Sequence, residues 1–133
     1  MKTYAFRLKP GQDLREEIDK FVKEHDMKAG VVVSCVGSLR KAVLRMAGAK
    51  PKAEPMKTYE GSFEIVSLVG TVEPGDRHLH IAISDKEGNV FGGHLKGGCI
   101  VETTAEVVIG ELEGVRFTRK LDPETGYDEL VVE

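Results

Sequence analysis

One segment of the chain has helical periodicity and the rest is patterned for strands, which restricts the fold more than any other feature. Between Gln12 and about Met27 the apolar residues are spaced i, i+4, i+7 and i+8, at Leu14, Ile18, Phe21 and Val22. This spacing predicts one amphipathic helix with a single apolar face. Acidic residues in its first half and lysines near its end suit the helix dipole. Gly30 is placed to end it.

The rest of the chain after Gly30 is patterned for strands, two of which are rich in apolar residues. Residues 31–37 are nearly all apolar, which predicts a strand buried on both faces, and residues 63–69, within a segment at 58–72, predict a second, largely buried strand. The remaining strands are expected at residues 3–8, 39–47, 78–84, 90–95, 105–112, 115–121 and 130–132. Residues 48–56 predict a loop, and Glu113-Gly114 a tight turn. We therefore expect an α+β fold in a single domain of residues 1–133: a mixed, mostly antiparallel sheet of about eight strands with one main N-terminal helix.

Residues 78–95 predict a hairpin whose register follows from its turn. Residues 85–89, Asp-Lys-Glu-Gly-Asn, fit a three-residue loop with Gly88 in the left-handed bulge position. Counting back along both strands from this turn pairs His80 with His94. Side chains two apart on a strand share a face, as do directly opposed residues. His78, His80 and His94 are therefore expected to project together, although a slip of one residue would move His94 to the other face.

Three converging imidazoles can hold a transition-metal ion. Zinc with three protein ligands keeps its fourth position open, which is the pattern of catalytic sites. Ala82 and Gly92 leave space beside the cluster. The alternative is that these histidines are polar residues on a solvated or inter-subunit face. His25 is expected to interact with the helix C-terminus, and Cys99 to be a small buried residue.

Composition narrows the classes of partner. The net charge is −3 and the pI about 5.8, a balance that disfavours a protein whose whole surface binds nucleic acid or membrane. No apolar run approaches the ~20 residues of a membrane span, and the N-terminus lacks the apolar core of a signal peptide. Two cysteines, Cys35 and Cys99, are too few for a disulfide framework. A cytoplasmic protein is therefore expected.

Four segments together resemble the plant- and prokaryote-conserved (PPC) domain, and the resemblance runs over nearly the whole chain. They are residues 29–39 (AGVVVSCVGSL), residues 61–70 (GSFEIVSLVG), the histidine hairpin and residues 104–108 (TAEVV). Plant members of this family carry the domain beside AT-hook motifs, whereas prokaryotic members usually stand alone. Ser62 stands where the plant motif Gly-Arg-Phe-Glu-Ile has arginine, so the partner-binding role of that motif is not carried over to this chain.

The resemblance implies a homotrimer with sites near subunit boundaries. The fold is also similar to that of acetolactate decarboxylase, whose zinc is held by three histidines in a comparable His-x-His…His arrangement. By that likeness His78, His80 and His94 are the expected ligands. No reaction is established for the family, and the decarboxylase activity is not transferred, because a fold does not fix a function.

Two functions are open, with a trimeric interaction scaffold as a third. The first is a metal-dependent enzyme or metal-assisted binder of a small carbonyl or carboxylate compound. Its candidate partner residues are Glu64, Glu102 and Arg45, each of which is also compatible with an ordinary polar position on a strand. The second is a DNA-associated or transcription-regulatory module that acts through protein contacts. Direct DNA binding is not expected, because the plant tetrapeptide Arg-Gly-Arg-Pro and a helix-turn-helix pattern are both absent.

Overall fold

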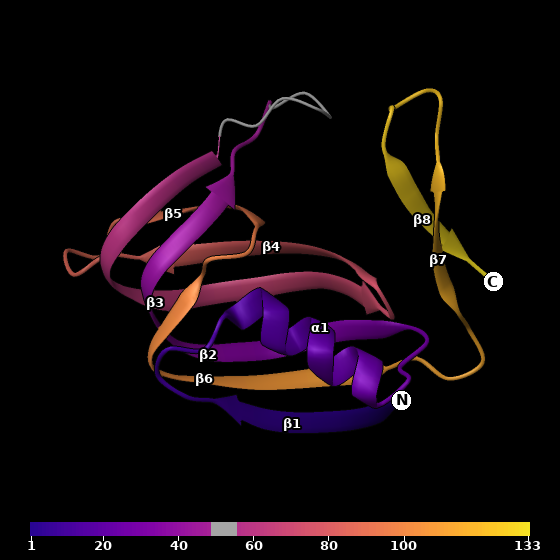
Figure 1. The fold of residues 1–133 in the computed structure, drawn as a ribbon, viewed down its shortest axis with the longest axis horizontal. Coiled ribbons are helices and arrows are strands. Elements are labelled where there is room, and N and C mark those ends of the chain that lie inside the picture. The colour runs from indigo at the N-terminus through magenta and orange to yellow at the C-terminus, as the bar shows by residue number, and fades with distance from the viewer. Residues whose placement is uncertain (49–55) are drawn as a thin grey trace.

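A six-stranded curved sheet forms the body of the molecule in the computed structural model, which describes residues 1–48 and 56–133. Its strand order is β1-β6-β2-β3-β4-β5 (Figure 1), and every strand pair in the described residues is antiparallel. The elements are β1 (Lys2–Leu8), α1 (Leu14–Glu24), β2 (Gly30–Arg45), β3 (Met56–Glu73), β4 (Asp76–Ser84), β5 (Val90–Leu95), β6 (Ile100–Glu111), β7 (Phe117–Leu121) and β8 (Asp128–Val132). The predicted α+β class, with one main helix and a mostly antiparallel arrangement of about eight strands, is confirmed.

Strand β5 joins two neighbours and so brings distant parts of the chain together. It pairs with β4 along one edge and with the end of β2 along the other, where Arg45 lies opposite His94. The predicted strands 31–37 and 39–47 are one continuous strand, β2, whose register shifts between Leu39 and Lys41. Such a bulge bends a strand. The bent β2 therefore reaches β5 with its last residues.

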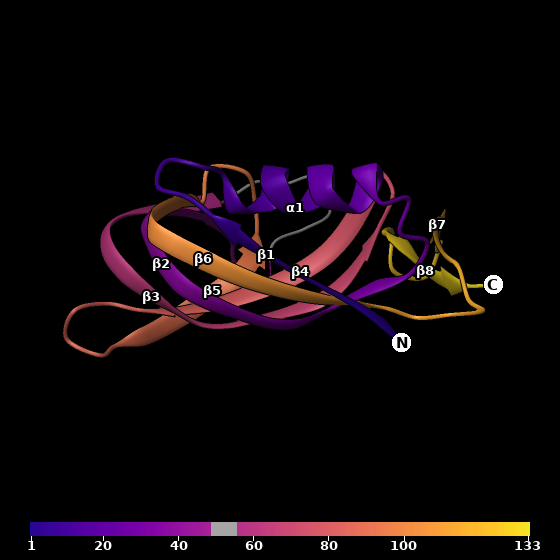
Figure 2. The ribbon, with the colours of Figure 1, turned by 90° about the horizontal axis from the view of Figure 1, so that it is seen from below.

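Helix α1 lies across the concave face of the sheet (Figure 2) and buries Leu14, Ile18 and Val22 against it. The Asp13 carboxylate caps the helix by accepting a hydrogen bond from the Glu16 backbone N–H at 3.1 Å. The helix ends earlier than predicted. Asp26 adopts a φ of 48°, in the left-handed region, which stops the helical backbone after Glu24 and His25.

The opposite face of the sheet carries exposed valines, which corrects the predictions that residues 31–37 are buried on both faces and that residues 63–69 are largely buried. Val33, Val36, Val66 and Val69, in β2 and β3, are 54%, 58%, 54% and 56% exposed. Their neighbours of opposite orientation, such as Cys35 and Leu68, are buried. The single helix covers one face only, so an apolar run here does not mean burial on both faces.

Strands β7 and β8 form a separate two-stranded sheet, which stands beside the main sheet in Figures 1 and 2. The predicted turn at Glu113-Gly114 is present, with Gly114 at a φ of 77°. The strands that flank this turn do not pair with each other, because β6 pairs with β1 and β2. Most of the predicted loop 48–56 lies outside the described residues. No helix in the described ranges combines the length and apolar content that crossing a bilayer requires.

Candidate metal centre

The β4–β5 hairpin has the register that its turn chemistry predicts. His80 lies opposite His94, Ala82 opposite Gly92 and Ser84 opposite Val90. The Asp85 carboxylate closes the turn by accepting hydrogen bonds from the backbone N–H groups of residues 87 and 89 at 2.9 and 3.0 Å. Residue 88 is the glycine at positive φ, 83°. This local chemistry fixes which face His94 occupies.

The three hairpin histidines form one cluster, as their register requires. One ligand nitrogen from each of His78, His80 and His94 lies within 4.8 Å of the others, and no further group of this kind occurs in the described ranges. The Nε2 atoms of His78 and His80 are 3.2 Å apart. A tetrahedral zinc ion with Zn–N distances of about 2.0–2.1 Å separates its nitrogen ligands by roughly 3.3 Å. The His78–His80 pair therefore has the nitrogen separation of a tetrahedral zinc site, and the His94 nitrogen lies near enough for the three residues to hold one ion.

The surroundings of His78 and His94 lower the pKa of both imidazoles, which favours the neutral form that binds metal. Partial burial is the largest cause that lowers the pKa of His94 to about 4, and the remaining causes are the positive charges of the neighbouring His78, Lys96, His80 and Arg45. Burial and then His80 and Arg119 also lower the pKa of His78. Desolvation and like charge thus act together against protonation.

Two glycines let the strands approach closely around the histidines. A Cβ at Gly70 would lie 1.8 Å from the carbonyl oxygen of His78, and one at Gly92 would lie 2.1 Å from that of Ile81. Both distances are far below any real contact of a Cβ with an oxygen. The space expected beside Gly92 is occupied by the backbone of the neighbouring strand.

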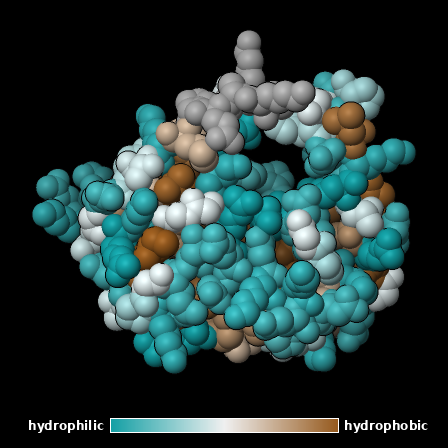
Figure 3. All heavy atoms as spheres, in the orientation of Figure 1, coloured by the Kyte–Doolittle hydropathy of each residue, from teal (hydrophilic) through white to brown (hydrophobic). Residues whose placement is uncertain are grey.

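The cluster opens into a cavity of about 590 Å³ between the main sheet and the β7–β8 hairpin. Figure 3 shows this side of the molecule hollowed between its body and a projection on the right. The cavity is lined by Arg45, Met46, Ala47, Gly48, Asp76, Arg77, His78, His80, Gly92, Gly93, His94, Arg119, Tyr127, Asp128 and Glu129. A volume in this range suits a small molecule.

Of the three candidate partner residues, the structure brings only Arg45 to the cluster. Arg45 lies opposite His94, lines the cavity and donates a hydrogen bond from Nη2 to the Tyr127 hydroxyl at 2.7 Å. Glu64 is exposed between Ser38 and Ser84 on neighbouring strands. Glu102 accepts a hydrogen bond from the Ser62 hydroxyl at 3.3 Å. Neither glutamate lines the cavity.

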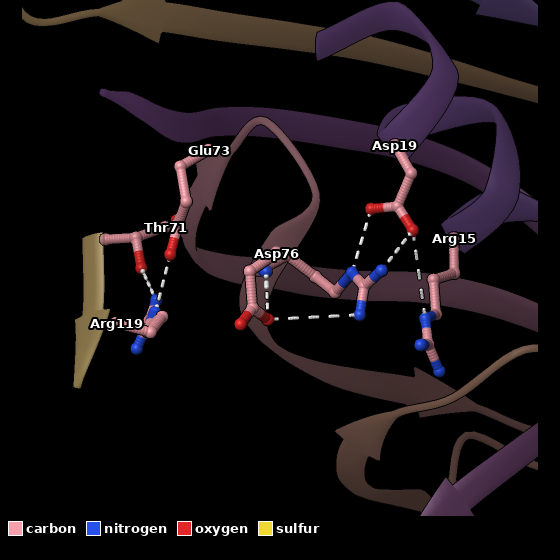
Figure 4. Close-up of polar contacts among 7 residues, drawn as sticks. Arg15, Asp19, Thr71, Glu73, Asp76 and Arg119 are labelled. Atoms are coloured by element: carbon pink, nitrogen blue, oxygen red, sulfur yellow. Dashed lines mark hydrogen bonds and ion pairs between the residues drawn. The ribbon is translucent and has the colours of Figure 1, made fainter. Parts of the chain in front are cut away.

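Sequence reasoning missed the wall that the C-terminal hairpin contributes: Arg119, Tyr127, Asp128 and Glu129. Figure 4 shows how Arg119 fastens β7 to the end of β3. Its Nε lies 2.5 Å from Oε1 of the buried Glu73, and its Nη2 donates to the Thr71 hydroxyl at 2.9 Å. Arg77 pairs with Asp19 of α1 through two hydrogen bonds of 2.9 and 2.6 Å. The sequence contained a turn signal at residues 122–126 (DPETG) but none for these distant contacts.

The remaining histidine and the cysteines lie outside the cluster. His25 follows α1, where its Nδ1 is 2.9 Å from the Phe21 carbonyl oxygen and its ring stacks on that of Phe21. Cys99 is fully buried beside the backbone of Val43. Burial raises the pKa of both Cys35 and Cys99 to about 11, so neither thiol is a ready metal ligand or nucleophile at neutral pH.

Comparison with solved structures places this geometry among known folds. The chain matches a hypothetical protein of Salmonella cholerae-suis with 42% identity and a TM-score of 0.94, over 99% of this chain and 93% of that one. It matches a metal-containing protein of Archaeoglobus fulgidus with 30% identity and a TM-score of 0.85, over 98% and 94% of the two chains. A Staphylococcus aureus protein similar to α-acetolactate decarboxylase shares the fold at 17% identity and a TM-score of 0.52, over 85% and 54%.

Comparison with curated sequences identifies the family. The chain is 43% identical to the bifunctional protein GlmU of Synechococcus sp. (strain JA-3-3Ab) over its full length, which is 21% of that protein. It is 29% identical to AT-hook motif nuclear-localized protein 6 of Arabidopsis thaliana, over 81% of this chain and 28% of that protein. It thus spans between about a fifth and just over a quarter of these relatives. The Plants and Prokaryotes Conserved (PCC) domain model matches residues 1–113. The chain therefore belongs to the Plants and Prokaryotes Conserved domain family, as its sequence motifs indicated.

Proposed function

We propose that this protein binds a divalent transition-metal ion, most simply zinc, through His78, His80 and His94 and uses the cavity beside it to bind or convert a small carbonyl or carboxylate compound. The observation that carries the proposal is the convergence of three imidazole nitrogens within 4.8 Å at the wall of a cavity of about 590 Å³. The metal-containing relative from Archaeoglobus fulgidus supports it.

The residues around the cluster suit an oxygen-bearing ligand. When bound, zinc supplies a Lewis acid that polarises a carbonyl or carboxylate oxygen. Arg45, opposite His94, brings a guanidinium to the same face of the hairpin, and guanidinium groups bind and orient carboxylates. Asp128 and Glu129 on the facing hairpin are carboxylates within the same cavity. They are the groups that would hold or move a proton there.

Metal analysis of protein purified without a histidine tag tests the proposal. After incubation with zinc and removal of excess, the wild type should hold about one ion per chain. The His80→Ala variant should hold only background metal, and His25→Ala should hold as much as the wild type because His25 lies outside the cluster. A wild type that takes up no zinc, cobalt, nickel or manganese would refute the metal site.

A second candidate, a DNA-associated or regulatory module, rests on the plant relatives. Their name refers to an AT-hook motif, and the Arg-Gly-Arg-Pro tetrapeptide of that motif is absent from this chain. The candidate therefore predicts protein contacts rather than direct DNA binding. A gel-shift assay at low salt tests this directly, since phosphate contacts are strongest there. A salt-dependent shift with duplex DNA would favour direct binding over the metal-dependent function.

The protein is also proposed to act as a homotrimer, as its family resemblance implies. The exposed valines of β2 and β3 support an interface between copies of the chain. Val69 lies directly opposite His80, so this apolar face continues to the edge of the histidine cluster. A subunit contact there would enclose the site further.

A further inference from the structure

Arg119 of the C-terminal hairpin lies beside the histidine cluster. Its Nη2 donates a hydrogen bond to the Thr71 hydroxyl at 2.9 Å, and Thr71 lies directly opposite His78 in the pairing of β3 with β4. Directly opposed side chains share a face of the sheet, with their Cβ atoms about 5 Å apart. Arg119 also lines the cavity into which the cluster opens. It follows residue 113, where the family match ends, so it lies outside the region that defines the family.

The guanidinium of Arg119 has N–H groups to spare. Its Nε bonds Glu73 and its Nη2 bonds Thr71, and Arg119 makes no other hydrogen bond or ion pair among the described residues. An arginine carries five N–H donors, so those of Nη1 are not used by these residues. Figure 4 shows this remaining nitrogen on the side of the guanidinium away from Glu73 and Thr71. Nη1 is not fully buried, because Glu73 Oε2 is the one buried side-chain nitrogen or oxygen without a partner in residues 1–48 and 56–133. It is therefore accessible from the cavity that Arg119 lines.

The same two contacts hold the guanidinium in a fixed orientation. The Arg119 side chain is 10% exposed and that of Glu73 is 3% exposed, so their ion pair is largely shielded from water. A guanidinium that is already oriented loses little conformational entropy when it binds a ligand. Guanidinium groups match carboxylates in both shape and charge. Arg119 is therefore positioned to bind an anionic oxygen through Nη1.

A second positive group would lie at the histidines themselves. Three neutral imidazoles bring no negative charge to a divalent ion, so the charge of the ion is left for a ligand to balance. The cavity then presents two positive groups, the ion and the Arg119 guanidinium, to one ligand. We propose that Arg119 determines specificity by pairing with the second carboxylate of a dicarboxylate ligand whose first carboxylate lies at the histidine cluster. This inference rests on the proposed metal function and names the class of ligand that the site takes.

Carboxylate binding to the cobalt-loaded protein tests the proposal, because the visible absorption of Co²⁺ reports on its surroundings without requiring a known reaction. Succinate and glutarate are each compared with the monocarboxylate of equal carbon number, butyrate and valerate. The wild type should bind at least one dicarboxylate about tenfold more tightly than its counterpart, the gain expected for one hydrogen bond between charged groups. The double variant Arg119→Met, Glu73→Gln, which leaves no buried charge unpaired, should lose this preference. Its affinities for Co²⁺ and the monocarboxylates should be unchanged.

Two single variants accompany the double variant. Arg119→Lys keeps a cation beside Glu73, and so keeps the hairpin in place, but its ammonium lacks the second nitrogen of the guanidinium fork. It should lose the preference for dicarboxylates as well. The matched control is Arg116→Met, which removes an exposed guanidinium just before β7 that does not line this cavity. This control should keep the preference.

Three results would overturn the proposal. The wild type could bind succinate and glutarate no more tightly than butyrate and valerate. Either Arg119 variant could keep the preference, as chelation of the ion by both carboxylates would require, or could lose mono- and dicarboxylates alike. In these cases the metal site itself stands. A wild type that binds no Co²⁺ refutes the proposed function, and this inference with it.

Discussion

Gly70 of β3 lies directly opposite Leu79, the residue between the first two histidines of the cluster, and its backbone approaches the carbonyl of His78. The space for a Cβ at position 70 is filled by that carbonyl oxygen, 1.8 Å from the Cβ position. The φ of Gly70 is 139°, which L side chains rarely adopt. The absence of a side chain at Gly70 thus allows β3 to pair closely with β4, the strand that carries His78 and His80.

Replacing Gly70 with alanine is therefore expected to destabilise the protein by about 3 kcal/mol and to weaken metal binding at the same time, because the β3–β4 pairing must shift. Gly97→Ala is the control, since a Cβ there has no neighbour within 4 Å. Its effect should stay within about 1 kcal/mol. Urea unfolding measures the stability of each variant, and zinc titration measures its metal affinity. Equal stability of Gly70→Ala and the wild type would contradict the close approach.

The histidine hairpin was predictable because its register depends on local turn chemistry. Asp85 and Gly88 lie within the turn that they define, so counting from them was enough to place His94. The C-terminal wall was not predictable in the same way. Arg119 reaches Glu73 across 46 positions of sequence, and periodicity contains no information about such a pair. The same limit explains why residues 31–37 were wrongly predicted to be buried on both faces, since a run of valines does not reveal whether one or both faces of the sheet are covered.

The metal-free protein is expected to lose stability as the pH falls from about 6.5 toward 4. Burial lowers the pKa of His94 to about 4 in the folded state, whereas the unfolded chain binds this proton at a higher pH. The unfolded state therefore holds more protons in this window, and acidification favours unfolding. In EDTA, His94→Gln should show a shallower decline of unfolding free energy between pH 6.5 and 5 than the wild type. An unchanged slope would contradict the lowered pKa.

The exposed valines lead to a prediction about assembly. Burial of one valine in a subunit interface contributes about 1.5–3 kcal/mol, so a charge at Val66 should break the proposed trimer. We expect Val66→Lys to be a monomer by light scattering at concentrations where the wild type is a trimer. Val90→Lys is the control, because Val90 is 58% exposed beside the β4–β5 turn and not on β2 or β3. A monomeric wild type, or a trimeric Val66→Lys, would count against this interface.

The contact between Arg119 and Glu73 is predicted to hold the C-terminal hairpin against the sheet. The Glu73 side chain is 3% exposed and that of Arg119 is 10% exposed, and Glu73 Oε2 has no hydrogen-bond partner in the described residues. Removal of the arginine leaves a buried carboxylate without its cation, which typically costs about 3–5 kcal/mol. Arg119→Met should therefore release the β7–β8 hairpin, seen as faster hydrogen exchange over residues 117–132.

Two further variants separate this charge effect from simple loss of packing. Arg116→Met breaks an ion pair with Glu133 in which the two side chains are 62% and 54% exposed and lie 3.6 Å apart. Its loss should lower the free energy of unfolding by less than about 1 kcal/mol. Adding Glu73→Gln to Arg119→Met removes the stranded charge, so the double variant should be more stable than Arg119→Met alone. If the double variant is instead no more stable, the buried carboxylate is not the source of the cost, and the hairpin is held by packing around Phe117, which is 8% exposed.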